Sequence, residues 1–129
     1  MIAYLDTSAA MKLLVEESES AALTAYLQSD ERLDVLASWL LHTELHCAAN
    51  RHPDDIDKAS VGVVLDTLTL VDVTRGDLLT AAALPGRLRS NDAVHLAVAL
   101  RVGAEGVITY DAELAAAATS SGLEALGPA

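Results

Sequence analysis

The sequence contains no phenylalanine, one tryptophan and three tyrosines. Proteins that bind single-stranded nucleic acid often stack successive bases on aromatic side chains. With so few aromatic residues, we expect no stacked-base platform in this chain. Any contact with a nucleic acid would then have to use the sugar-phosphate backbone and metal ions.

The chain also lacks a second cysteine and any hydrophobic run long enough to cross a membrane. Its single cysteine, Cys47, excludes an internal disulfide and fits a reducing cytoplasm. Because Cys47 lies in an alanine-rich helical segment, we expect it to be packed in the core. The first residues lack the basic and then apolar pattern of a secretory signal. We therefore expect a cytoplasmic protein with no membrane segment.

Basic residues are scarce: eight lysines and arginines face nineteen aspartates and glutamates, which gives a net charge of −11. Taken alone, this balance argues against nucleic-acid binding, since phosphate neutralisation needs a basic face. Either the partner is basic or bound cations reverse the charge locally. What the chain has in abundance is apolar residues, 52% of its 129. Its length and composition predict a single domain over residues 1–129 with one core.

Helical and strand patterns alternate along the chain. Strands are expected at 2–5, 33–37, 69–73, 106–110 and 122–126, and helices at 8–15, 18–28, 39–50, 56–68, 77–84, 90–101 and 111–120. Strands that alternate with helices are typical of a parallel sheet covered by helices on both faces. The sequence therefore predicts a three-layer α/β/α domain with a mostly parallel central sheet of four to five strands.

Two of these strands end in the same way. Asp6 follows the apolar run Ile2–Leu5 and directly precedes a helix, and Asp111 follows the strand at 106–110 and begins the next helix. In a parallel sheet both aspartates lie along one edge, where open α/β sheets bind their ligands. Each could instead act only as a helix N-cap.

Two further acidic residues lie on expected helices. Asp92 is in the first turn of its helix, where the helix dipole favours an anion. Glu44 lies in the middle of its helix, with leucines on both sides of it in the sequence. If Asp6, Glu44, Asp92 and Asp111 converge, their mutual repulsion must be relieved by protons or cations. Ligands that are all oxygen select Mg²⁺ or Mn²⁺ over Zn²⁺. Such a cluster can support in-line attack on a phosphodiester.

Four short motifs in this order resemble the PIN-domain ribonucleases, and within them the VapC-type toxins of bacterial toxin–antitoxin pairs. They are Leu5-Asp6-Thr7-Ser8-Ala9 with Lys12-Leu13, Thr43-Glu44-Leu45, Asp92-Ala93-Val94-His95-Leu96-Ala97, and Thr109-Tyr110-Asp111-Ala112-Glu113-Leu114. The resemblance covers nearly the whole chain, and the family's acidic quartet falls on Asp6, Glu44, Asp92 and Asp111. It implies a PIN-like fold, Mg²⁺-dependent endoribonuclease activity, a homodimer, and neutralisation by a cognate antitoxin.

Roles for individual residues follow as hypotheses. Asp6 and Asp92 are expected to bind the metal directly, while Glu44 and Asp111 complete the coordination or orient water. Hydrogen bonds from Thr7, Ser8 and Thr109 are expected to hold these carboxylates, as outer groups do around metal ligands. His95 follows Asp92 by three residues and either supports the cluster or packs in the helix.

Three basic residues and one histidine pair complete the set of candidates. Arg87 and Arg89 are expected to contact the RNA backbone. Lys12 could touch phosphate or pair with Glu16 one helical turn away. The pair His42 and His46 has the spacing of a Zn²⁺ site on one helix face but lacks a third ligand.

Other functional classes remain open at this stage. A receiver-type signalling domain also gathers aspartates and Mg²⁺ at strand ends, but it needs a lysine late in the chain, and none follows Lys58. A phosphatase of the Asp-x-Asp type is excluded because Ser8 stands two residues after Asp6. A non-catalytic or phospho-signalling module that binds a metal and a protein partner is the alternative.

Overall fold

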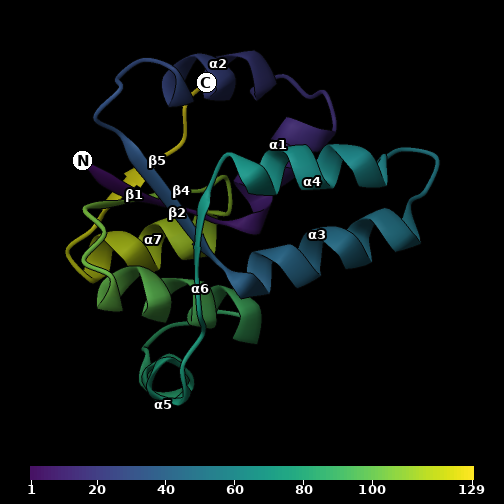
Figure 1. Ribbon diagram of the computed structural model, residues 1–129. Coiled ribbons are helices and arrows are strands. Elements are labelled where there is room, and N and C mark those ends of the chain that lie inside the picture. Colours follow the sequence, from purple (N-terminus) through teal and green to yellow (C-terminus); the bar gives the residue numbers. More distant parts are fainter.

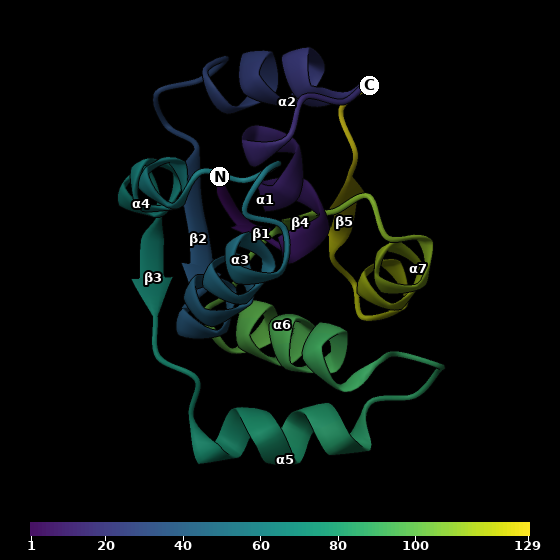
Figure 2. The same cartoon turned by 90° about the vertical axis from the view of Figure 1, so that its right-hand side faces the viewer.

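A sheet of five strands, all of them parallel, forms the middle of the computed structural model, which describes residues 1–129. Figure 1 shows the sheet with its helices, and Figure 2 shows the strands in the order β3-β2-β1-β4-β5. The strands are β1 (Ile2–Leu5), β2 (Asp34–Ser38), β3 (Thr69–Val71), β4 (Gly106–Ile108) and β5 (Glu124–Leu126). The helices are α1 (Thr7–Leu14), α2 (Ser20–Leu27), α3 (Trp39–Arg51), α4 (Lys58–Asp66), α5 (Arg75–Ala83), α6 (Ser90–Arg101) and α7 (Ala112–Ser120).

Alternation along the strands separates the core into two layers. Ala3 and Leu5 of β1 pack with residues of α1 to α4 on one face of the sheet, whereas Tyr4 packs with residues of α6 and α7 on the other. Strand β4 divides in the same way, with Ile108 on the first face and Val107 on the second. The buried strand residues on both faces explain why the first strand carries no charge. The predicted three-layer α/β/α fold is confirmed.

The order of the strands creates a topological switch point between β1 and β4. The chain moves outward from β1 to β2 and β3, and then returns across the sheet to β4 and β5. The connections on either side of such a point leave in opposite directions, so a crevice opens at the carboxyl ends of these two strands. Asp6 stands at this point, where its backbone N–H donates to the carbonyl of Ile108 at 3.2 Å.

All twelve elements lie where the sequence predicted them, with shifts of a few residues at their ends. The expected helix at 56–68 is shorter, because Asp57 caps it by accepting from the backbone N–H of Ala59. The expectation that Cys47 is packed in the core is wrong: its thiol is exposed. The buried residues of α3 are Leu41, Leu45, Ala48 and Ala49, and Cys47 projects from the opposite face of that helix. None of the seven helices combines the length and the apolar composition needed to span a membrane.

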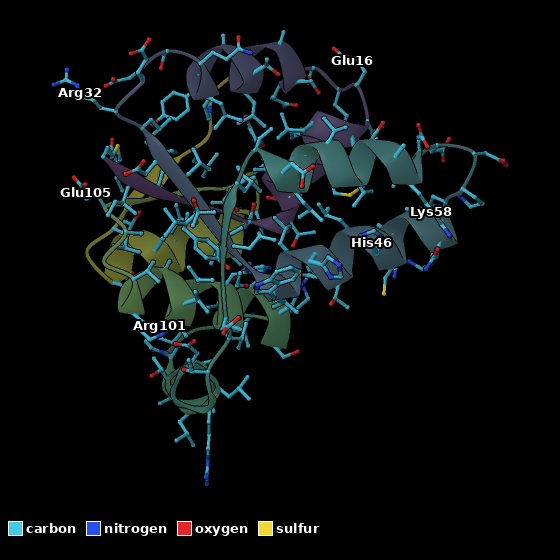
Figure 3. The ribbon with its side chains drawn as sticks, viewed as in Figure 1. Glu16, Arg32, His46, Lys58, Arg101 and Glu105 are labelled. Atoms are coloured by element: carbon cyan, nitrogen blue, oxygen red, sulfur yellow. The ribbon has the colours of Figure 1, made fainter.

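A buried carboxylate attaches α5 to α6. Asp77 forms a capping box with Thr74 at the start of α5, and it also accepts a hydrogen bond of 2.8 Å from Arg101 Nε at the end of α6. Arg101, labelled in Figure 3, donates in addition to the backbone carbonyl of Asp72 at 2.7 Å. Burial alone would raise the pKa of Asp77, but the hydrogen bonds from Arg101 and Thr74 outweigh it and hold the pKa below its usual value.

Replacing this carboxylate tests the attachment. Asp77→Ala is expected to lower the free energy of unfolding by about 1–2 kcal/mol at pH 7, because it removes a helix cap and the carboxylate that Arg101 pairs with, whereas water screens the exposed guanidinium. Since the pKa of Asp77 is depressed in the folded state, its contribution is full above the unfolded-state pKa and disappears as the pH falls through the folded-state value. Urea unfolding of both proteins at several pH values measures this difference. Asp54→Ala, which makes the same change of charge in an exposed loop, is the control; equal losses in the two variants would contradict the attachment.

Candidate active site

Asp6 connects strand β1 to helix α1 without a loop. Its Oδ1 accepts from the backbone N–H of Ala9 at 2.9 Å, so the side chain is the N-cap of α1. The same carboxylate accepts from Ser8 Oγ at 2.8 and 2.9 Å and from Thr109 Oγ1 at 2.6 Å. Burial raises the pKa of Asp6, against the hydrogen bonds from Thr109, Ala9 and Ser8, which lower it. Asp6 therefore serves as a cap and still presents a buried carboxylate at the switch point.

Three aspartates from separate elements surround one small pocket at this edge of the sheet. Asp6 comes from the end of β1, Asp92 from the first turn of α6, and Asp111 from the N-cap of α7, where it accepts from the backbone N–H of Leu114. The complete lining is Asp6, Thr7, Ser8, Met11, Arg89, Asn91, Asp92 and Asp111. Met11 is the single apolar residue among them. The pocket, called the aspartate pocket below, is thus lined almost entirely by groups that can bind cations or donate hydrogen bonds.

The charges of these aspartates are only partly compensated. Burial raises the pKa of Asp92, and the nearby carboxylates of Asp111 and Asp6 raise it further. Arg89 opposes this effect: its Nε lies 3.7 Å from Asp92 Oδ2, and its Nη2 lies 3.3 Å from Asp111 Oδ2. The guanidinium is largely exposed, so water screens its charge. The raised pKa of Asp92 shows that repulsion and burial outweigh Arg89.

The donor atoms of the aspartate pocket fit a hard divalent cation. They are carboxylate and hydroxyl oxygens with no thiolate among them, which suits Mg²⁺ or Mn²⁺. In this conformation no three histidine, cysteine, aspartate or glutamate side chains are arranged to hold one common ion. The guanidinium of Arg89 spans Asp92 and Asp111. The aspartates of the pocket are the residues that would hold such an ion, and its charge would take over the compensation that Arg89 now supplies to Asp92 and Asp111.

Glu44 lies behind the aspartate pocket rather than in its lining. Its Oε1 accepts from Thr7 Oγ1 at 2.8 Å and lies 2.6 Å from His95 Nε2, while its Oε2 accepts from Asn91 Nδ2 at 2.9 Å. Burial alone would raise the pKa of Glu44, but the hydrogen bonds from His95, Asn91 and Thr7 outweigh it and lower the pKa. The four predicted carboxylates therefore do not all meet: three share the pocket, and Thr7 and Asn91, which line it, connect it to Glu44.

A buried chain of hydrogen bonds extends from Glu44 into the sheet. His95 is fully buried, and its Nδ1 lies 2.6 Å from the hydroxyl of Tyr4, which donates to Ser38 Oγ at 3.0 Å. Ser38 is the N-cap residue of α3 but forms no capping bond through its side chain, which leaves its hydroxyl free for Tyr4. Burial raises the pKa of Tyr4. This chain fixes the imidazole of His95 against the Glu44 carboxylate.

Sequence reasoning missed Tyr4, Ser38 and Asn91 as members of the site. One signal was available for Tyr4, since it bears the only hydroxyl in the apolar strand β1 and a buried hydroxyl needs a partner. The partners of Ser38 and Asn91 are more than thirty residues away along the chain, and no local pattern indicates them.

The predicted basic residues separate in the structure. Arg89 reaches the aspartate pocket, whereas Arg87 is exposed and lines a different hollow. Lys12 is also outside the pocket: its Nζ lies 2.9 Å from carboxylates of both Glu17 and Glu19. The expectation that Lys12 pairs with Glu16 is therefore wrong, because the Lys12 ammonium forms ion pairs with Glu17 and Glu19 instead. The rings of His42 and His46 lie 4.6 Å apart, but no third ligand joins them to form a zinc site.

Comparison with known proteins identifies similar chains. The model of the PIN domain family matches residues 3–119. Ribonuclease VapC46 of Mycobacterium tuberculosis is 37% identical over 128 residues, which cover 97% of this chain and 96% of that protein. The crystal structure of M. tuberculosis VapC20, a sarcin-ricin loop cleaving toxin, superimposes with a TM-score of 0.72 at 17% identity over 89% of this chain and 94% of that one. VapBC2 of Rickettsia felis, solved with a promoter DNA fragment, gives a TM-score of 0.74 at 14% identity and 97% coverage of both chains.

Neutralising one aspartate tests the repulsion in the pocket. Asp92→Asn is expected to raise the free energy of unfolding by about 1 kcal/mol at pH 7 without divalent cations. Because the pKa of Asp92 is raised in the folded state, the wild type loses stability as the pH rises from the unfolded-state pKa to the folded-state pKa, and the loss persists above it. The variant lacks this loss.

Urea unfolding from pH 4 to 8, with and without Mn²⁺, measures both effects. Mn²⁺ at about 100 times its Kd should stabilise the wild type by roughly 2–3 kcal/mol and the Asp92→Asn protein much less. Asp54→Asn, in an exposed loop, makes the same change of charge outside the pocket and serves as the control. A variant that is less stable than the wild type at pH 7 and responds equally to Mn²⁺ would contradict repulsion at this site.

Proposed function

Because this chain belongs to the PIN-domain family and is related over nearly its whole length to a VapC ribonuclease, we propose that it is a ribonuclease that hydrolyses RNA phosphodiester bonds with the help of Mg²⁺. Mn²⁺ is the expected substitute, since it accepts the same oxygen ligands. Its biological role is that of the toxin in a toxin–antitoxin pair. The family membership is the basis for the proposed reaction class, and the three aspartates of the pocket are the basis for the proposed metal dependence.

We propose that Asp6 and Asp92 bind the cation directly, and that Glu44 and Asp111 complete the coordination or orient the attacking water. A divalent cation bound here would activate water and neutralise the charge that develops on the phosphodiester. Ser8 and Thr109 orient the carboxylate of Asp6 through three short hydrogen bonds.

The groups around Glu44 hold this carboxylate, and the arginine of the pocket faces the substrate. His95, Asn91 and Thr7 keep Glu44 ionised and fixed, as its lowered pKa indicates. A carboxylate that stays charged at neutral pH can attract a cation or accept a proton from water. The exposed guanidinium of Arg89 is free to turn from the aspartates to a substrate phosphate once a cation replaces it, and such contacts are favoured by the planar, bidentate geometry of arginine.

Partners and location follow from the same assignment. The neighbour from R. felis is a VapBC assembly, and we propose that a cognate antitoxin binds this chain as well. A net charge of −11 favours a basic partner surface. We also propose a homodimer, and a cytoplasmic location that suits an exposed free thiol at Cys47. The non-catalytic or phospho-signalling alternative is not favoured, because the family match and the VapC relative both point to a nuclease.

Loss of one metal ligand tests the reaction. Asp6→Asn is expected to reduce the cleavage of single-stranded RNA in Mg²⁺ by at least about 100-fold, which exceeds the usual effect of removing a group that only supports a ligand. Circular dichroism should show an unchanged fold, since asparagine is also a good N-cap. Asp54→Asn, purified in parallel, should cleave as the wild type does. Full cleavage by the folded Asp6→Asn protein, or wild-type cleavage that persists in EDTA, would refute the proposal.

The two arginines before α6 supply a second test. Arg87→Ala/Arg89→Ala is expected to weaken the binding of a phosphorothioate oligoribonucleotide and to reduce the slope of log K against log salt by about 1–2, because each lost phosphate contact releases fewer counterions. Titrations at several NaCl concentrations in Mg²⁺ give the slope. Arg32→Ala, in the loop before β2 (Figure 3), removes a cation far along the chain from the pocket and should leave the slope unchanged. An unaltered slope in the double variant would show that neither arginine meets phosphate.

A further inference from the structure

Tyr4 is the one residue of strand β1 whose side chain carries a polar group. The side chain is fully buried, and it packs with Leu96, Val107 and Leu114 on the face of the sheet that α6 and α7 cover. A phenylalanine at this position would fill nearly the same space without a hydroxyl, and a buried hydroxyl needs hydrogen-bond partners. The partners of the Tyr4 hydroxyl therefore indicate what it contributes.

Two polar groups meet this hydroxyl. It donates to Ser38 Oγ at 3.0 Å, and it lies 2.6 Å from His95 Nδ1. The Ser38 partner alone would satisfy the single proton of the hydroxyl. The second and shorter contact leads to the candidate site, because Nε2 of the same His95 ring lies 2.6 Å from Glu44 Oε1. Tyr4 is thus connected to a proposed functional carboxylate through one imidazole.

The orientation of Glu44 depends most on His95. The contact with His95 Nε2, at 2.6 Å, is shorter than the hydrogen bonds that Glu44 accepts from Thr7 at 2.8 Å and from Asn91 at 2.9 Å. The lowered pKa of Glu44 keeps it ionised, and an ionised carboxylate only accepts hydrogen bonds, so Nε2 is the donor. Such charge-assisted bonds are the stronger ones. Any rotation of the His95 ring therefore disturbs the carboxylate.

The two nitrogens of a rigid ring cannot move independently. A rotation of the His95 ring that turns Nε2 away from Glu44 also breaks the contact between Nδ1 and Tyr4. Because a hydroxyl both donates and accepts, Tyr4 can hold Nδ1 whether or not that nitrogen carries a proton. The three residues lie on β1, α6 and α3, so the central strand of the sheet fixes a carboxylate on a helix.

We propose that Tyr4 is a positioning residue for RNA cleavage: acting through His95, its hydroxyl holds the Glu44 carboxylate in the orientation that the reaction needs. The proposal rests on the proposed ribonuclease function and adds to it a residue outside the pocket. Tyr4 is fully buried and does not line the aspartate pocket, so it touches neither RNA nor metal. Loss of its hydroxyl therefore lowers kcat and leaves KM unchanged.

Nuclear magnetic resonance of the metal-free protein tests the positioning without any cleavage. His95 is the only buried histidine of the four, so its Nε2–H should be the one histidine ring proton that exchanges slowly with water. Its short bond to a carboxylate should place this signal far downfield. Tyr4→Phe keeps the aromatic ring and removes the hydroxyl. In this variant the signal is expected to move upfield and to exchange faster.

Cleavage kinetics in Mg²⁺ measure the consequence. Tyr4→Phe is expected to lower kcat by about 10-fold, the lower end of the effect of groups that support a metal ligand, with KM unchanged. Ser38→Ala removes the other partner of Tyr4 without removing a side-chain cap of α3, and it should give a smaller loss in the same direction. Tyr110→Phe is the matched control, since its hydroxyl donates to the Pro128 carbonyl at 2.6 Å and should leave kcat unchanged. Circular dichroism and urea unfolding verify the fold of each variant.

The outcomes separate this proposal from the ribonuclease proposal. Where the wild type cleaves RNA, an unchanged kcat or an unchanged His95 signal in the folded Tyr4→Phe protein refutes the positioning role alone. Equal losses of kcat in Tyr4→Phe and Tyr110→Phe, or a loss that appears only in KM, also overturn it. A wild type that does not cleave RNA refutes the ribonuclease proposal; a His95 signal that shifts in Tyr4→Phe and not in Tyr110→Phe would still support the hold of Tyr4 on Glu44.

Discussion

The repulsion among three aspartates, two of them buried and the third half-buried, is the constraint around which this site is organised. Asp6, Asp92 and Asp111 are far apart in the sequence, yet the switch point between β1 and β4 gathers them around one pocket. The raised pKa of Asp92 reflects its burial and the two neighbouring carboxylates. Arg89 compensates the charge only in part. A fold that keeps such an arrangement has stability to gain from a divalent cation, which is the physical reason for proposing a metal-dependent reaction.

Neutral donors hold these charges in place. The hydroxyls of Ser8 and Thr109 fix Asp6, and helix N-termini supply backbone N–H groups to Asp6 and Asp111. Glu44 is fixed by a different set, which extends through His95 and Tyr4 to the interior of the sheet. Because Tyr4 points to the opposite face of β1 from Ala3 and Leu5, the strand contributes at once to the core and to the support of the site. Such preorganisation lowers the cost of binding a cation.

The parts of this protein that local patterns determine could be predicted from the sequence. Strand and helix periodicity was sufficient for the layers and the parallel sheet, and the two strand ends located Asp6 and Asp111. Contacts between distant segments could not be predicted: the bond from His95 to Glu44 joins residues 51 apart in sequence, and that from Tyr4 to Ser38 joins residues 34 apart. The exposure of Cys47 depends on which side of α3 faces the core, and the helix pattern alone was too weak to fix that side.

Diffraction from crystals grown with Mn²⁺ tests the central claim most directly, because anomalous scattering locates the metal independently of any activity. The account predicts one or more peaks in the aspartate pocket, about 2.0–2.2 Å from carboxylate oxygens of Asp6 and Asp92, with Arg89 displaced from Asp92 and Asp111. A pocket without a peak at saturating Mn²⁺, with Arg89 still paired to both aspartates, would contradict the assignment of a metal site to these residues.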